Sequence, residues 1–235
     1  MKILSLTNTP LDLALGSGKT VIAWSQGLRD LGHEVDVFPP QSFYHPWPRD
    51  SGKRIKMRID AKCLAETILA NKYDLVEFYG AEFGLLVDKL SRVNRDSRPL
   101  LVAHTNGLEL LASESVVKTN PNLNTSTLQS IGASILHPVI ARIDRLAFAK
   151  VDAFAAICEA DKNYVVSHKI QAIERCAVVE PGVDQVFLSS LWHRPKKQIL
   201  LSFASWTSRK DPQTFLSCSC GPVPSKPHKF RVQAS

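Results

Sequence analysis

The sequence lacks any hydrophobic run long enough to cross a membrane. Its first apolar stretch, Ile3–Leu6, follows a single lysine and is broken at once by Thr7–Pro10. A membrane-spanning helix needs about 20 predominantly apolar residues, and a signal peptide needs an apolar region of about 7–15. We therefore expect a cytoplasmic protein without a transmembrane segment.

Cysteine is also scarce, and its spacing does not indicate a disulfide framework. The five cysteines are Cys63, Cys158, Cys176, Cys218 and Cys220. An odd number without framework spacing predicts free thiols in a reducing compartment. Cys218 and Cys220 are separated by one residue rather than two, and no second pair or histidine–carboxylate cluster accompanies them. We therefore expect no metal site.

Acidic residues are outnumbered, with 22 Asp and Glu against 29 Lys and Arg, which gives a net charge of +7. Aromatic residues are not interleaved with basic ones, so a single-stranded nucleic acid platform is not expected. The densest basic run lies at residues 53–58. It is either a solvated face where a loop enters a helix, or a contact for a membrane surface or an acidic substrate. Peripheral membrane contact thus stays open as an alternative.

Strand-like and helix-like segments alternate along most of the chain. The segments expected as strands are Lys2–Thr7, Glu34–Phe38, Leu75–Phe78, Leu100–Ala103, Ala153–Ile157, Ala177–Val179 and Gln198–Phe203. Helices are expected at residues 19–31, 58–70, 82–91, 138–148 and 159–166, the first with a buried stripe of Val21, Trp24, Leu28 and Leu31. This order predicts an α/β protein with a doubly wound, parallel, Rossmann-like sheet.

Two parts of the chain depart from this alternation. Residues 112–134 are rich in Ser, Thr and Asn and predict a long loop. A polar linker near residue 191 marks an expected domain boundary, so the prediction is one domain at 1–190, a linker and the start of a second α/β domain at 191–215, and an irregular tail at 216–235. A single strand would expose unpaired backbone on both sides, so the chain is expected to be truncated within its second domain.

A glycine-rich segment, Gly16-Ser17-Gly18-Lys19-Thr20, lies between the first strand and the first helix. Glycines there allow backbone amides to approach a phosphate, and the helix N-terminus favours negative charge. A Walker A motif would require a further glycine where Leu13 stands. The segment is therefore a phosphate- or sugar-approaching loop of another α/β family, a tight turn that opens a helix, or a P-loop-like site.

Polar residues also follow the later strands. His104, Asn106 and Glu109 come after the fourth strand, at the edge of the sheet where open α/β proteins bind ligands. His104 either donates to a substrate hydroxyl or phosphate, or is a structural residue at the strand end. Glu109 and Glu159 either share this site or act as acids at helix starts.

Taken in order, several short motifs resemble the family-four (group 1) glycosyltransferases of the GT-B type. They are Met1–Leu4, Gly16–Gly18, Leu31–Val35, Ala103–Gly107, Ala155–Ala160, Glu180–Asp184 with Phe187, and Phe203–Trp206 with Arg209 and Lys210. Such enzymes have two Rossmann-like domains that face each other across a cleft. The resemblance makes residues 1–190 the acceptor-side N-terminal domain.

The resemblance also implies roles for individual residues. Gly16, Ser17 and Gly18, together with Arg209 and Lys210, would hold the diphosphate of a nucleotide-sugar donor. His104 would be the catalytic residue beside the transferred sugar. Asn106, Glu109 and Glu159 would lie near the sugar or the acceptor. Arg209 and Lys210 could equally be a surface basic pair. Ser205 stands where the family has an arginine, and Arg209 could partly substitute for it.

The implied activity is transfer of a sugar to an unidentified glycan, lipid or small molecule, with retention of configuration. The resemblance implies that no metal or other cofactor is needed. No nucleic acid partner is expected. The family's paired glutamates have no counterpart in this sequence, so we expect this chain to have little activity. The alternatives are a non-catalytic acceptor-binding module and a P-loop-like nucleotide-binding protein.

Overall fold

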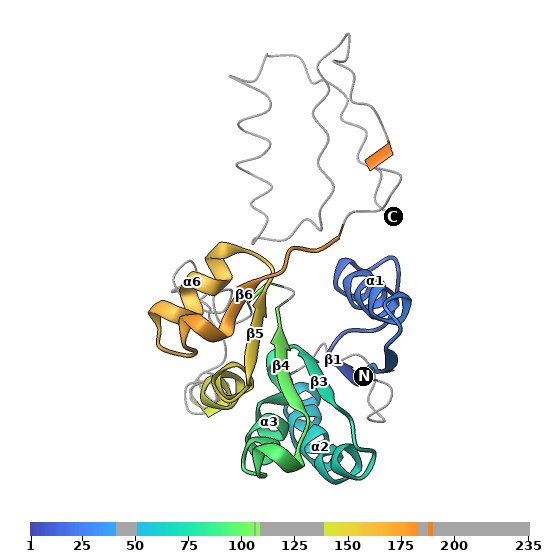
Figure 1. The fold of residues 1–235 in the computed structure, drawn as a ribbon. Coiled ribbons are helices and arrows are strands. Elements are labelled where there is room, and N and C mark those ends of the chain that lie inside the picture. Colours follow the sequence, from blue (N-terminus) through green and yellow to red (C-terminus); the bar gives the residue numbers. More distant parts are fainter. Residues whose placement is uncertain (41–50, 106, 109–138, 183–187, 190–235) are drawn as a thin grey trace, which may run out of the picture. The chain divides into compact units, whose positions relative to one another are not determined.

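A computed structural model describes residues 1–40, 51–105, 107–108, 139–182 and 188–189 (Figure 1). The chain divides into one compact unit at residues 1–183 and another at 184–235. Only the first unit is described at length. The predicted linker at 191–215, the second-domain strand and the tail lie outside the described residues and stay predictions.

The first unit alternates strands and helices as expected. Its elements are β1 (Lys2–Thr7), α1 (Gly16–Asp30), β2 (Glu34–Phe38), α2 (Ser51–Ala70), β3 (Leu75–Tyr79), the 3-10 turn η2 (Ala81–Phe83), α3 (Gly84–Ser91), η3 (Arg95–Ser97), β4 (Leu100–His104), β5 (Ala153–Ala156), α6 (Glu159–Ser167), η4 (Ile173–Arg175) and β6 (Cys176–Val178). Residues 139–149, which follow the undescribed segment 109–138, are also helical.

The six strands form one parallel sheet in the order β2-β1-β3-β4-β5-β6. The chain starts in β1, moves outward to β2 and then returns past β1 to build the rest of the sheet. This confirms the predicted doubly wound, Rossmann-like α/β fold. It also places the reversal of strand order between β1 and β3.

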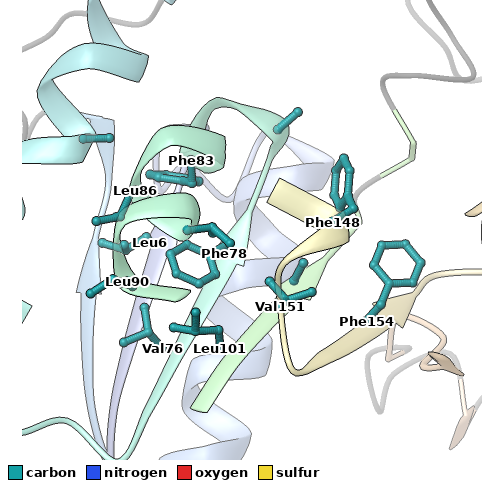
Figure 2. Packing of buried hydrophobic residues seen from close by; sticks show 14 of the residues in the cluster. Leu6, Val76, Phe78, Phe83, Leu86, Leu90, Leu101, Phe148, Val151 and Phe154 are labelled. Atoms are coloured by element: carbon teal, nitrogen blue, oxygen red, sulfur yellow. The ribbon is translucent and has the colours of Figure 1, made fainter. Parts of the chain in front are cut away.

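The two faces of the sheet differ in chemistry. Leu4, Leu6, Val76, Phe78 and Leu101 alternate along β1, β3 and β4 and join the buried core against α2 and α3 (Figure 2). The intervening positions point to the opposite face because successive strand residues alternate. That face carries the polar residues Ser5, Glu77 and His104, and the α1 residue Trp24 bonds to Glu77 there. Helix α1 therefore covers a polar face, and α2 and α3 cover an apolar one.

Gly32 follows the end of helix α1 as the predicted stop, although the start of the helix was predicted wrongly. The amides of Gly32 and His33 donate to the carbonyls of Arg29 and Leu28, and Gly32 has a φ of 85°. This is the Schellman arrangement, in which a glycine with positive φ ends a helix. The helix begins at Gly16 rather than Lys19. Gly16–Gly18 are therefore the first turn of a helix, not a loop.

Three further sequence predictions need correction. Leu31, which was expected on the buried stripe of α1, is 75% exposed because it follows the last turn of the helix. The helix expected at 82–91 is a 3-10 turn followed by α3. Helix α2 begins at Ser51, so the basic run 53–58 lies within a helix.

Arg58 corrects the interpretation of that basic run as a uniformly solvated face. Its side chain is 4% exposed, and its guanidinium donates to both oxygens of Asp144 at 2.7 Å. A bidentate guanidinium–carboxylate pair is geometrically specific. Arg58 therefore joins α2 to the helical segment 139–149.

Candidate functional site

The polar site lies at the carboxyl ends of the central strands. Thr7 of β1 pairs in register with Tyr79 of β3, Tyr79 with His104 of β4, and His104 with Ala155 of β5. Open α/β sheets bind ligands outside the carboxyl ends of their strands, where the strand order reverses. In this sheet that position is between β1 and β3, and β3 is adjacent to β4, which ends at His104.

The Glu77 carboxylate is the centre of a buried hydrogen-bonded cluster. Ser5 Oγ donates to Glu77 Oε2 at 2.8 Å, and Trp24 Nε1 donates to Oε1 at 2.9 Å. His104 Nε2 lies 3.1 Å from the same Oε1. Glu77 is only 4% exposed, so these contacts replace the water that its charge would otherwise bind.

The His104 ring is held on two further sides by aromatic rings. It stacks on Tyr79 with ring centroids 4.6 Å apart and meets Trp24 edge to face at 5.2 Å. The residue is 8% exposed. The orientation of the imidazole is therefore fixed by contacts from β3 and α1.

The cluster shifts the ionisation of its acids. Burial alone would raise the pKa of Glu77, but the hydrogen bond with His104, together with those from Trp24 and Ser5, lowers it below its usual value. Burial and the neighbouring Glu77 carboxylate raise the pKa of Tyr79 well above that of a free phenol. Glu77 is consequently a carboxylate and Tyr79 a neutral phenol at neutral pH.

A second buried acid lies where β1 and β3 end. Glu82 is 1% exposed, and its Oε2 accepts a hydrogen bond from Asn8 Nδ2 at 2.7 Å. The amide of Asn8 donates to the Tyr79 carbonyl. Gly80, with a φ of 124°, leaves the space that the Asn8 side chain fills. These contacts fix the loops that follow β1 and β3, where the order of strands in the sheet reverses.

Thr105 connects the end of β4 to the start of α6. Its Oγ1 donates to Asp161 Oδ2 at 2.9 Å and accepts from the Ile157 amide at 3.1 Å. Asp161 lies in the first turn of α6, where an acid complements the helix dipole. Its carboxylate also ties that turn to the strand that carries His104.

The N-terminus of α1 has no side-chain cap. Leu15 at the N-cap position supplies no side-chain hydrogen bond, and the first turn contains no acidic residue. The first helical hydrogen bond of the backbone is that from the Lys19 amide to the Leu15 carbonyl. The amides of Gly16, Ser17 and Gly18 precede that bond, and such amides have no partner within the helix.

The glycines of this turn have different packing. A Cβ on Gly18 would lie 2.4 Å from the Pro10 carbonyl oxygen and 2.7 Å from that of Asp12, whereas a Cβ on Gly16 would meet nothing within 4 Å. Gly18 thus lets the loop after β1 pack against the helix. Thr20 donates its hydroxyl to the Gly16 carbonyl at 3.0 Å.

The other predicted site residues are divided between described and undescribed parts of the chain. Glu159 is exposed in the first turn of α6 at the same sheet edge, and no hydrogen bond joins it to His104 there. Asn106, Glu109, Arg209 and Lys210 lie outside the described residues, so their roles stay predictions.

The described residues contain neither a candidate metal site nor a candidate membrane-spanning helix. They contain no group of three or more His, Cys, Asp or Glu side chains placed to hold a metal ion. They also contain no helix of sufficient length and apolarity to span a bilayer.

Sequence reasoning missed Glu77, Ser5 and Trp24 as neighbours of His104. One signal was present: Glu77 interrupts an otherwise apolar strand, and a buried acid requires partners. Alternation along β3 then predicts that Glu77 and Tyr79 share a face. The sequence could not show that α1 covers the same face with an indole N–H.

The parallel sheet, its strand order and the polar edge define a Rossmann-like α/β domain of the kind that forms the N-terminal half of GT-B glycosyltransferases. Residues 15–186 match the family model described as Glycosyltransferase Family 4. The match covers more than half of the sequence, so the chain belongs to that family. No curated protein matches the chain.

Proposed function

We propose that this protein acts in the transfer of a sugar from a nucleotide-sugar donor to an acceptor. The observation that carries the proposal is the position of His104. It is held by Glu77, Trp24 and Tyr79 at the carboxyl edge of the sheet in a Glycosyltransferase Family 4 domain. In this proposal His104 is the catalytic residue beside the transferred sugar.

The first turn of α1 supports a role in binding the donor diphosphate. Because α1 follows β1, its N-terminus starts at the same carboxyl edge of the sheet. Free amides and the helix dipole favour an anion at such a turn, and no acidic side chain occupies it. Gly16, Ser17 and Gly18 would contribute their amides, with Arg209 and Lys210 as the proposed cationic partners.

The remaining features of the reaction rest on the family relationship. We propose retention of configuration without metal or another cofactor, with leaving-group charge stabilised by amides and cations. Asn106, Glu109 and Glu159 are the proposed residues near the sugar or acceptor, which could be a glycan, a lipid or a small molecule. A binding module that retains only acceptor affinity is the alternative within the same family.

The P-loop-like hypothesis has less support. The family match concerns glycosyltransferases. In addition, the Thr20 hydroxyl that a P-loop would direct to a magnesium ion donates to the Gly16 carbonyl.

Titration calorimetry of the full chain with a panel of uridine- and guanosine-diphosphate sugars tests the proposal. We expect binding of at least one donor, and a loss of about tenfold or more in affinity for Ser17→Asp. The added carboxylate would occupy the anion position at the helix N-terminus. Because an acid there also favours the helix dipole, this loss would not reflect unfolding.

Ala23→Glu is the matched control, because it adds the same charge at an exposed position near the middle of α1. It should leave donor affinity within about twofold. Absence of binding for every donor, or equal affinity for wild type and Ser17→Asp, would contradict the proposal. Unchanged binding in the presence of a chelator is expected if no metal takes part.

A further inference from the structure

His104 has one ring nitrogen engaged within the protein. Its Nε2 lies 3.1 Å from Glu77 Oε1. Within the described part of the chain, Nδ1 has no hydrogen-bond partner, and the side chain is 10% exposed. The outward bonding directions of the two ring nitrogens diverge, so the contact at Nε2 leaves Nδ1 as the nitrogen available to a ligand.

The acceptor at Nε2 is itself fixed. Glu77 Oε1 accepts from Trp24 Nε1 and Oε2 accepts from Ser5 Oγ, so α1 and β1 both hold the carboxylate. A carboxylate can only accept hydrogen bonds, and its partner must therefore carry the proton. This places a hydrogen on Nε2 of His104.

We propose that Glu77 is the positioning residue of His104. It fixes the proton on Nε2, so that Nδ1 is the ring nitrogen that accepts a hydrogen bond from a sugar hydroxyl of the donor. This inference rests on the proposed transferase function. It reverses one expectation from the sequence, in which His104 donates to the substrate. The assignment follows the general rule that the bond made by one imidazole nitrogen sets the role of the other.

The tautomer can be measured without any activity. In long-range proton–nitrogen spectra of the 15N-labelled full chain, the His104 signals are identified by their loss in His104→Ala. We expect a slowly exchanging Nε2–H and an unprotonated Nδ1 near neutral pH. A proton on Nδ1 instead would overturn the proposal. This measurement uses the wild type and so does not depend on a buried variant folding.

Two variants test whether Glu77 determines the position of the proton on His104. Glu77→Met has a similar size but cannot accept the hydrogen bond, so the slowly exchanging Nε2–H signal should disappear. Ser5→Ala removes only the bond to the other oxygen, Oε2, and should retain the signal. Persistence of the signal in folded Glu77→Met would overturn the proposal.

A double-mutant cycle on donor binding separates positioning from general stability. If Glu77 acts through His104, Glu77→Met should weaken binding of the best nucleotide sugar about tenfold in the wild-type background and have almost no effect in His104→Ala. Equal losses in both backgrounds would contradict the proposal. If the wild type binds no donor, the proposed transferase function fails, while the tautomer measurement still decides the role of Glu77.

Discussion

At the end of β3, Gly80 has a backbone conformation that residues with a Cβ rarely adopt. Its φ is 124° and its ψ is 154°, and an added Cβ would lie 2.2 Å from Asn8 Nδ2. The Asn8 side chain occupies this space because it reaches the buried Glu82. Glycine is therefore required at position 80 both by the backbone conformation and by the packing of the Asn8 side chain.

Gly80→Ala should destabilise the protein by at least ~1–3 kcal/mol, the usual cost of such a conformation, with a further loss from the displaced Asn8–Glu82 bond. Urea unfolding monitored by circular dichroism measures the change. Gly16→Ala is the control, because its Cβ would meet nothing within 4 Å in a helical turn. Equal stability of the two variants would contradict this account of Gly80.

At the scale of the elements, a glycine determines how closely two helical segments approach. A Cβ on Gly84, at the start of α3, would lie 1.9 Å from the carbonyl oxygen of Ile143. This backbone oxygen belongs to the helical segment 139–149 and cannot move like a flexible side chain. The contact joins α3 to a segment about sixty positions later in the sequence.

Gly84→Ala should therefore cost about 1–3 kcal/mol or more, as overpacking in a core does. Gly27→Ala is a matched exchange within a helix, and its Cβ would meet nothing within 4 Å. It should raise stability by up to ~1 kcal/mol, because alanine is the better helix former. The two midpoints in urea should shift in opposite directions, and shifts in the same direction would contradict this contact.

The buried pair of Arg58 and Asp144 joins the same segment to α2. Removing one partner leaves a buried charge with fewer compensating bonds, which typically costs about 3–5 kcal/mol. We expect a loss of this size for Arg58→Met. Replacing both residues, as in Arg58→Met with Asp144→Leu, should recover most of the stability.

Thermal unfolding of the two single variants and the double variant measures this coupling. The exposed pair of Lys56 and Asp60, whose side chains are 63% and 32% exposed, is the control. Lys56→Met should change stability by less than about 1 kcal/mol, as exposed ion pairs do. Additive losses in the double Arg58 and Asp144 variant would show that the pair is not coupled.

At the scale of the whole molecule, at least three carboxyl groups of the described residues make stability depend on pH. The hydrogen bond from Lys150 lowers the pKa of Asp88. Burial alone would raise the pKa of Asp152, but hydrogen bonds from Arg98 and the Leu101 amide lower it. The pKa of Glu77 is lowered by its hydrogen bonds to His104, Trp24 and Ser5. Each group binds a proton less readily in the folded than in the unfolded protein.

A carboxyl group of this kind stabilises the fold fully above its unfolded pKa, near 4, and loses that contribution as pH falls through the lower folded pKa. The urea midpoint should therefore be constant between about pH 6 and 7 and fall progressively below about pH 5. In Asp152→Asn the decrease should be smaller, because one titrating group is absent. A midpoint that rises on acidification would contradict this assignment.

Much of the fold was predictable because each element has a local signal. The apolar period of α1, the stop at Gly32 and the apolar strands depend on neighbours in the sequence, and the parallel sheet follows from their alternation. Helix starts were predicted less well. Gly16–Gly18 resemble a loop in composition, and the basic run 53–58 resembles a solvated surface segment, but both segments lie within helices.

The candidate site was predictable only in part. His104 could be selected because it follows a buried strand, and strand ends of parallel sheets share one edge. Its partners could not be selected in the same way. Glu77, Trp24 and Ser5 are distant in the sequence and meet only because α1 covers the polar face of β1, β3 and β4.

The sequence by itself determined the class of fold and the sheet edge where His104 lies. Apolar periodicity and the alternation of strands with helices along the chain are local properties of the sequence. Tertiary structure alone decided which side chains surround that histidine and which buried acids are paired. Those contacts span 27 to 86 positions, and their geometry depends on how the helices pack on the two faces of the sheet. The proton position proposed for His104 is a consequence of that packing.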